Sequence, residues 1–202
     1  MLRHLIYPFL PYRSLFYPFF VACAFAVPSW VAFRLYRRRT TGRRESLRRE
    51  LLLLTFVVYL AGLASATLTP NRPSREVAEA ARAITLRPDA ASLTCASASM
   101  PDGSRARGFC MRNAQGNIAL FFPLGLLLPL VWRRLRFRDG LLIALGVSVG
   151  IEVLQYVSRA IGSLRNADVN DVILNVLGAG LGLVLGLLLR WRPRGSAEVS
   201  RA

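Results

Sequence analysis

The apolar residues of this 202-residue chain are gathered into long blocks, and nearly all charged residues lie between the blocks. The blocks span 15–33, 51–68, 117–132, 140–157 and 169–189. A helix needs about 20 apolar residues to cross a bilayer, so each block is long enough or nearly so. The sequence therefore predicts an all-α fold, a polytopic membrane helix bundle of about five transmembrane helices.

The 27 lysine-or-arginine positions are all arginine, and sixteen of them lie in three short segments. Residues 34–50 hold eight, residues 133–138 hold four, and the tail from 190 onward holds four. The positive-inside rule makes these segments cytoplasmic, which places the N-terminus outside and the C-terminus inside. We expect the arginine clusters to contact anionic lipids of the bilayer rather than nucleic acid. Use of arginine alone favours a GC-rich bacterium such as an actinobacterium, and hence a multi-pass protein of the bacterial plasma membrane.

This topology predicts three regions. Residues 1–50 form an N-terminal transmembrane helix with an arginine-rich cytoplasmic loop, 51–190 a membrane domain with an external loop at 69–116, and 191–202 a basic cytoplasmic tail. Cys95 and Cys110 lie in the external loop, where oxidation is permitted. A disulfide between them would close a ring of about 15 residues and stabilise the chain by about 3 kcal/mol. We expect this disulfide; two free thiols are the alternative.

Polar residues that are costly in hydrocarbon gather near the expected outer ends of the last three blocks. They are Asn117, Glu152, Gln155, Arg165, Asp168, Asp171 and Asn175. At 100° per residue, Glu152 and Gln155 share one face of the fourth helix. The acidic face of the fifth helix continues inward as the small-residue ridge Gly178, Gly182 and Gly186, which allows close helix packing. The pattern predicts that the fourth and fifth helices face one another, with a ligand-binding polar pocket in the outer leaflet above the ridge.

Simpler interpretations exist for several of these residues. Asp168 can cap the fifth helix, with Asp171 as its capping-box partner, and Asn117 can cap the start of the third helix. The glycine ridge can serve packing alone, and Glu152 can form a structural ion pair with a nearby arginine. The sole histidine, His4, offers no metal-ligand spacing, and no phosphate-binding or dinucleotide motif is present. No metal and no cofactor are therefore expected.

Four motifs together resemble the VanZ-like family of bacterial membrane proteins over about residues 51–190. They are Tyr59 with Thr67-Leu68-Thr69-Pro70, Asn117-Ile118 through Pro123-Leu124-Gly125, Ile151-Glu152-xx-Gln155, and Arg165-xx-Asp168-xx-Asp171 through Asn175, Gly178 and Gly182. The first block lies outside the resemblance. The founding member is associated with resistance to teicoplanin, a lipid-bearing glycopeptide, so the resemblance implies an envelope role and gives no biochemical activity.

Three functions fit these residues. The first is a non-enzymatic envelope protein whose outer-leaflet pocket binds a lipid head group or lipoglycopeptide, with Arg165 pairing an anion, and influences glycopeptide tolerance. The second is a membrane enzyme acting on a lipid-linked substrate, with Glu152 or Asp171 as general base. The third is lipid transport, which requires a polar route across both leaflets, whereas the inner halves of the blocks are Leu, Val and Gly.

Overall fold

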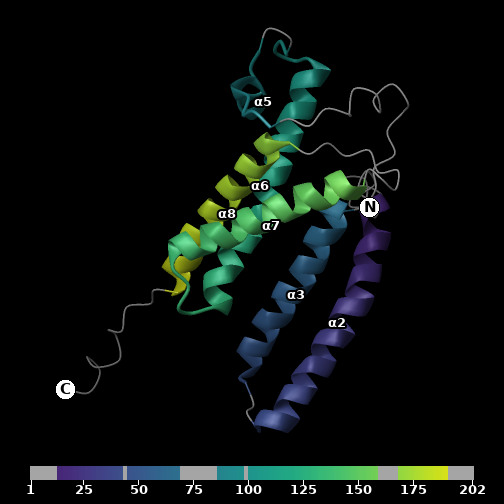
Figure 1. Ribbon diagram of the computed structural model, residues 1–202, viewed down its shortest axis with the longest axis vertical. Helices are drawn as coiled ribbons and strands as arrows, with labels where there is room; N and C mark the ends of the chain where they lie inside the picture. Colours follow the sequence, from purple (N-terminus) through teal and green to yellow (C-terminus); the bar gives the residue numbers. More distant parts are fainter. Residues whose placement is uncertain (1–12, 43–44, 69–85, 98–99, 159–167, 191–202) are drawn as a thin grey trace, which may run out of the picture. The chain divides into compact units, whose positions relative to one another are not determined.

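The computed structural model describes residues 13–42, 45–68, 86–97, 100–158 and 168–190 (Figure 1). The elements in these ranges are all helices, and isolated bridge residues occur at Ser97, Met100 and Asp168. The helices are α2 (Arg13–Thr41), α3 (Leu47–Leu68), α5 (Ala90–Thr94), α6 (Arg105–Val131), α7 (Phe137–Ser158) and α8 (Val169–Arg190). The expected all-α fold is confirmed.

Five of the described helices are long and apolar enough to cross a membrane, namely α2, α3, α6, α7 and α8. These helices correspond to the five apolar blocks of the sequence. A membrane solvates the apolar side chains that these helices expose, and helices satisfy their own backbone hydrogen bonds within hydrocarbon. The expectation of about five transmembrane helices is confirmed.

The start of α6 differs from the expectation. The helix begins at Arg105, twelve residues before Asn117, so the interpretation of Asn117 as the cap that opens the third helix is wrong. Ser104 is the N-cap, and its hydroxyl accepts a hydrogen bond of 3.2 Å from the backbone N–H of Arg107. Arginine, methionine and glutamine between this cap and Asn117 are good helix formers, so the helix continues through polar sequence.

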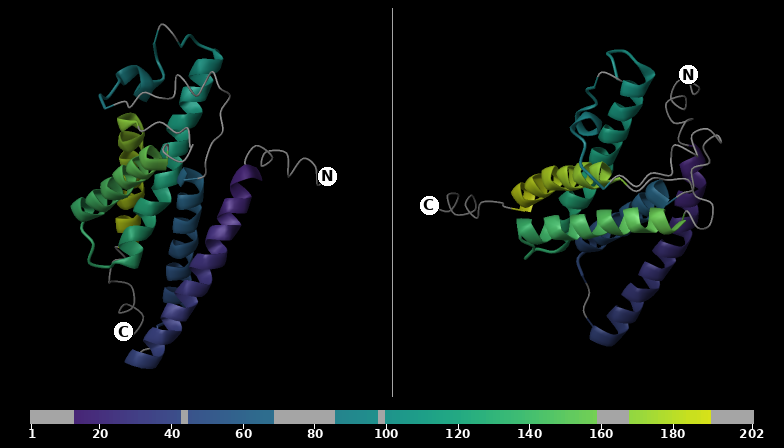
Figure 2. Two further views of the ribbon diagram at one scale, coloured as in Figure 1. Left: turned by 45° about the vertical axis from the view of Figure 1, so that its right-hand side comes forward. Right: turned by 45° about the horizontal axis from the view of Figure 1, so that its top comes forward.

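The helix α2 is also longer than its apolar block, because it continues through an arginine-rich segment to Thr41. Its neighbour α3 lies beside it in Figures 1 and 2. Near their linked ends, Arg34 donates to both carboxylate oxygens of Glu50, at 3.1 and 2.6 Å. Such a forked, charge-assisted pair fixes the two helix ends against each other.

The chain divides into two compact units. The first unit contains α2, α3 and the last part of α7, and the second contains α5, α6, the first part of α7 and α8. In the second unit α6 and α8 pack along most of their shared length (Figure 2). This pair forms the centre of the unit, where Phe121, Leu124, Leu128 and Leu183 are almost fully buried.

Glycines allow the backbones of α6 and α8 to touch. The glycines at this contact are Gly125 of α6 and Gly178, Gly182 and Gly186 of α8. A Cβ atom at Gly182 would lie 2.7 Å from the backbone nitrogen of Leu126, and one at Gly178 would lie 2.8 Å from Cα of Ile118. These distances are too short for any side chain. The ridge therefore brings the two helices closer than side chains would permit.

The partner of the glycine ridge is α6, whereas the sequence pattern paired the fifth helix with the fourth. The reason is that α6 also contributes a glycine to the contact. Gly125 of α6 meets the backbone of Ala179 and of Leu183 in α8. The two glycines on the corresponding part of α7, Gly146 and Gly150, have no described atom within 4 Å of a Cβ built on them.

Gly182→Ala is expected to destabilise the protein by about 1–3 kcal/mol, because the added methyl group meets backbone that cannot yield. Gly180→Ala is the matched control on the same helix. Its added Cβ meets only Leu141 Cδ2 at 3.6 Å, an ordinary contact, and alanine is the better helix former. Thermal unfolding in mild detergent measures both variants, and an equal fall in Tm would contradict the backbone contact.

Candidate functional site

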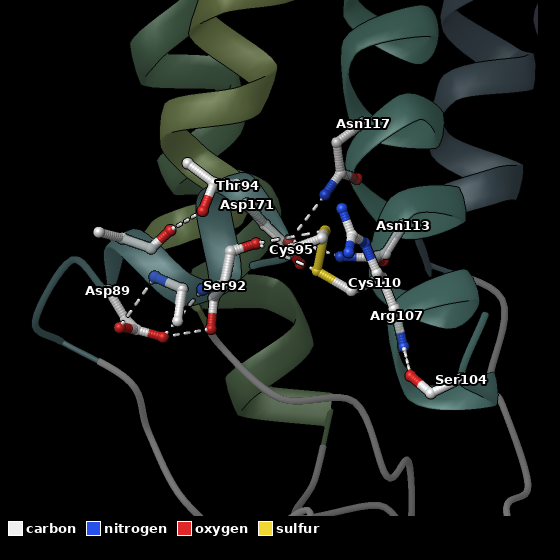
Figure 3. The surroundings of a disulfide bond; sticks show 12 residues. Asp89, Ser92, Thr94, Cys95, Ser104, Arg107, Cys110, Asn113, Asn117 and Asp171 are labelled. Atoms are coloured by element: carbon white, nitrogen blue, oxygen red, sulfur yellow. Dashed lines mark hydrogen bonds between the residues drawn. A yellow bond between two sulfur atoms is a disulfide. The ribbon is translucent and has the colours of Figure 1, made fainter. Parts of the chain in front are cut away.

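The outer-end residues expected on α6 and α8 are brought together by hydrogen bonds. The side-chain amide of Asn117 donates to Oδ1 of Asp171 at 2.6 Å, and that of Asn113 donates to the same oxygen at 2.9 Å (Figure 3). Asn113 and Asn117 are four residues apart, so they occupy one face of α6. The two amides orient the Asp171 carboxylate and join the helices beyond the glycine contact.

Asp168 directly precedes α8 and caps its first turn. Its Oδ1 accepts from the backbone N–H of Asn170 at 2.9 Å and from the side-chain amide of Asn170 at 2.8 Å. This is the capping geometry expected for Asp168. Asn170 is 3% exposed, and its own side-chain oxygen accepts from the backbone N–H of Asp89 at 2.9 Å. The start of α8 is thereby tied to the start of α5.

The short helix α5 is held by its own cap. The Asp89 carboxylate accepts from the Ser92 hydroxyl at 2.6 Å, from the Ser92 backbone N–H at 2.9 Å and from the Ala91 backbone N–H at 3.2 Å. These hydrogen bonds, that of the Ser92 hydroxyl first, hold the pKa of Asp89 below its usual range. The cap is therefore complete at neutral pH and is lost as the pH falls through this lowered pKa.

A disulfide joins Cys95 to Cys110, with a Cα–Cα distance of 5.6 Å (Figure 3). Cys95 caps the end of α5 in the left-handed region, at φ 55°, and Cys110 lies in the first turns of α6. The disulfide and the Asn170 hydrogen bond fasten α5 to α6 and to α8. The start of α8 and the first turns of α6 therefore carry a covalently anchored cap.

A second polar contact lies deeper, between α7 and α8. The side-chain amide of Asn175 donates to Oγ of Ser148 at 2.9 Å, and both residues are buried. The other amide atom, Oδ1 of Asn175, is buried without a hydrogen-bond partner in the described part of the chain. This oxygen can accept one donor from water or from a ligand.

The third polar contact belongs to the first unit and involves the last part of α7. Gln155 donates from its side-chain amide to the backbone carbonyl of Thr67 near the end of α3, at 2.8 Å. The Thr67 hydroxyl in turn donates to the carbonyl of Leu63 at 2.7 Å. Glu152 lies about one helical turn before Gln155 and is only 9% exposed, compared with 7% for Gln155. The fourth span thus carries a buried carboxylate and a buried carboxamide on one face.

The described hydrogen bonds give the expected site residues different partners. Asn117 joins Asp171, Asn175 joins Ser148, and Gln155 joins Thr67. Arg165 lies outside the described residues. In the ranges that the structure describes, no group of three or more His, Cys, Asp and Glu side chains could hold a metal ion.

Sequence reasoning missed Asn113, Asn170 and Thr67 as partners in these groups. A signal for Asn113 was present, because Ser104 follows a Pro-Asp-Gly turn and is a good N-cap residue. A helix starting there puts Asn113 one turn from Asn117. The role of Thr67 had no signal in the sequence, since it contributes a backbone carbonyl.

Asp171→Ala is expected to lower stability by about 1–3 kcal/mol, because it removes the acceptor of both asparagine amides. Asp171→Asn keeps an oxygen at the position that accepts both bonds, so its loss should be smaller. Thermal unfolding in detergent gives the comparison. Equal losses for the two variants would show that the negative charge, and not the acceptor, matters at this position.

The chain matches a known family. The model of the family described as VanZ/LLP1 matches residues 56–190, which takes in α6, α7, α8 and most of α3. No curated protein and no solved structure matches the chain. The matched segment exceeds half of the chain and confirms the resemblance carried by the sequence motifs. The chain is a multi-pass membrane protein that belongs to the VanZ/LLP1 family.

Proposed function

We propose that this protein is a non-enzymatic receptor in the outer leaflet of a bacterial plasma membrane. It binds the polar part of an envelope lipid or a lipoglycopeptide through Glu152 and Gln155, and thereby influences tolerance to teicoplanin-type glycopeptides. The observation that carries the proposal is the burial of Glu152, 9% exposed, inside a helix apolar enough to cross the membrane. A carboxylate in such a place costs several kcal/mol of folding free energy unless it finds a partner, and ionisable residues inside membrane spans are rare and commonly functional.

The neighbourhood of Glu152 supports recognition of a polar group. Gln155 is fixed by its hydrogen bond to the carbonyl of Thr67, and Ser65 and Thr67 of α3 are 6% and 7% exposed. Four buried polar residues of the first unit thus lie on the end of α3 and the last turns of α7. A fixed carboxamide beside a carboxylate offers both donors and acceptors to a ligand.

The chemistry of these groups favours one class of ligand. An ionised carboxylate only accepts hydrogen bonds, so Glu152 is complementary to hydroxyl or ammonium donors and repels phosphate. Sugars and aminosugars carry such donors, and a lipid tail keeps them at the membrane. Any phosphate of the same ligand would be met by Arg165 in this proposal. A lipid-anchored glycan or a lipoglycopeptide is therefore the preferred ligand.

The polar groups of α6 and α8 have a supporting part in this proposal. Asp171 and Asn117 are bonded to each other, and the disulfide-anchored α5 is fastened to the same helix ends. These contacts hold the outer end of the second unit in one arrangement. Direct contact of Asn117, Asp168, Asp171 and Asn175 with the ligand stays a prediction.

Glu152→Gln is expected to weaken binding of a teicoplanin-type lipoglycopeptide by about tenfold, because the amide replaces a charged acceptor of nearly the same shape. The measurement is titration of the purified full chain in phospholipid nanodiscs, followed by native mass spectrometry. Asp139→Asn is the matched control, since it makes the same chemical change at the other end of α7, where the carboxyl is half exposed.

Equal binding of the lipoglycopeptide by the wild type and by Glu152→Gln, with both proteins folded, would contradict the proposal. The enzymatic alternative is tested on the same samples by incubation with lipid-linked envelope precursors. A change of substrate mass that Glu152→Gln abolishes would replace binding by catalysis as the function.

A further inference from the structure

A cleft between α2 and α3 lies outside the part of the chain that matches the family, because its residues all precede residue 56. Its volume is about 270 Å³. The lining residues are Trp30, Val31, Arg34, Leu35 and Arg38 of α2, with Glu50, Leu51 and Leu54 of α3. The cleft thus combines an apolar wall with a charged rim, and it shares no lining residue with the three polar contacts described above.

The charges at the rim leave an excess of one positive charge. Glu50 accepts a forked pair from Arg34 and a further hydrogen bond of 3.1 Å from Arg38. Arg34 and Glu50 are largely buried, with side chains 13% and 12% exposed, whereas the side chain of Arg38 is 44% exposed. A guanidinium has five N–H donors, and Arg38 gives one of them to Glu50. Among the described residues, Glu50 is the acceptor for Arg38, so the remaining donors of Arg38 can reach an anion at the mouth of the cleft.

The apolar wall faces outward from the helix pair. Val31, Leu35 and Leu51 are exposed, on helices that are apolar enough to cross a membrane, so lipid chains surround them. Trp30 is half-buried at the same level, and tryptophan favours the boundary between lipid chains and head groups. The volume lies just below the range of about 300–1,000 Å³ that is usual for ligand pockets. It suits a phosphate-bearing head group with the beginning of one acyl chain.

We propose that this cleft binds one anionic phospholipid of the phosphatidylglycerol type from the adjacent leaflet. The phosphate meets Arg38 and the outer face of the Arg34–Glu50 pair, and the acyl chain lies along Val31, Leu35 and Leu51. Charge complementarity selects an anionic over a zwitterionic lipid, since residues 34–50 contain eight arginines and two glutamates. The apolar wall selects a lipid over a soluble phosphate.

Arg38→Gln tests this site, because it removes the excess charge and leaves the Arg34–Glu50 pair intact. We expect affinity for phosphatidylglycerol to fall by about tenfold, with affinity for phosphatidylcholine unchanged. Native mass spectrometry of the full chain, titrated with each lipid in detergent, measures both affinities. Arg37→Gln is the matched control, since it removes one charge from the next position of α2 and does not line the cleft. It should bind phosphatidylglycerol as the wild type does.

Val31→Trp gives a second test without a change of charge, because the larger side chain fills the cleft. It should reduce phosphatidylglycerol binding, whereas Val21→Trp at another exposed position of α2 should not. Excess inorganic phosphate should fail to displace the lipid. Equal weakening by Arg37→Gln and Arg38→Gln would indicate diffuse attraction and overturn the proposal, as would equal affinity of the wild type for the two lipids. The Glu152→Gln variant should keep this lipid, so failure here is distinguishable from failure of the proposed receptor function.

Discussion

The backbones of α6 and α8 touch because, at each point of contact, one of the two helices has a glycine. Within a membrane there is no hydrophobic force between helices, so close packing supplies much of the attraction. The glycines at Gly125, Gly178 and Gly182 provide this packing. The close approach also places the amide of Asn117 against Asp171 near the start of α8. The cap formed by α5 is then fastened to both helices by a disulfide and by the side chain of Asn170.

The polar residues fall into two sets, one whose contacts support the fold and one on which the proposed function rests. Asn117 and Asp171 bond to each other across the α6–α8 pair, and Asp168 caps α8, so these contacts support the fold. Glu152 and Gln155 lie on the last part of α7, where the carboxamide is fixed by a carbonyl of α3. The proposed receptor function rests on this second pair. At the arginine-rich ends of α2 and α3, the proposed lipid site has the opposite chemistry, because its rim is cationic.

Much of the fold was predictable from the sequence, because a bilayer imposes a length on every apolar block. The five blocks became five long helices, and the family motifs were recognisable from residue identities. Helix ends were less predictable, since α6 begins in polar sequence, directly after the cap at Ser104. Helical phase identified the glycine ridge but could not show which helix packs against it. That depends on Gly125 of α6, where the absence of a side chain lets the backbone of α8 come close. The role of the Thr67 carbonyl could not be predicted either, because every residue has a backbone carbonyl and the residue type does not show which one accepts a hydrogen bond.

The central claim is that the ligand meets the polar face formed by α7 and the end of α3. Its most direct test is photoaffinity labelling of the full chain in membranes with a photoreactive teicoplanin-type lipoglycopeptide, followed by tryptic mass mapping. Cleavage after arginine gives one peptide over 139–159, which contains Glu152 and Gln155, and one over 50–75, which contains Thr67. We predict attachment to these two peptides, competed by unlabelled lipoglycopeptide. Attachment confined to the 166–190 peptide, or labelling that competitor does not reduce, would contradict the account.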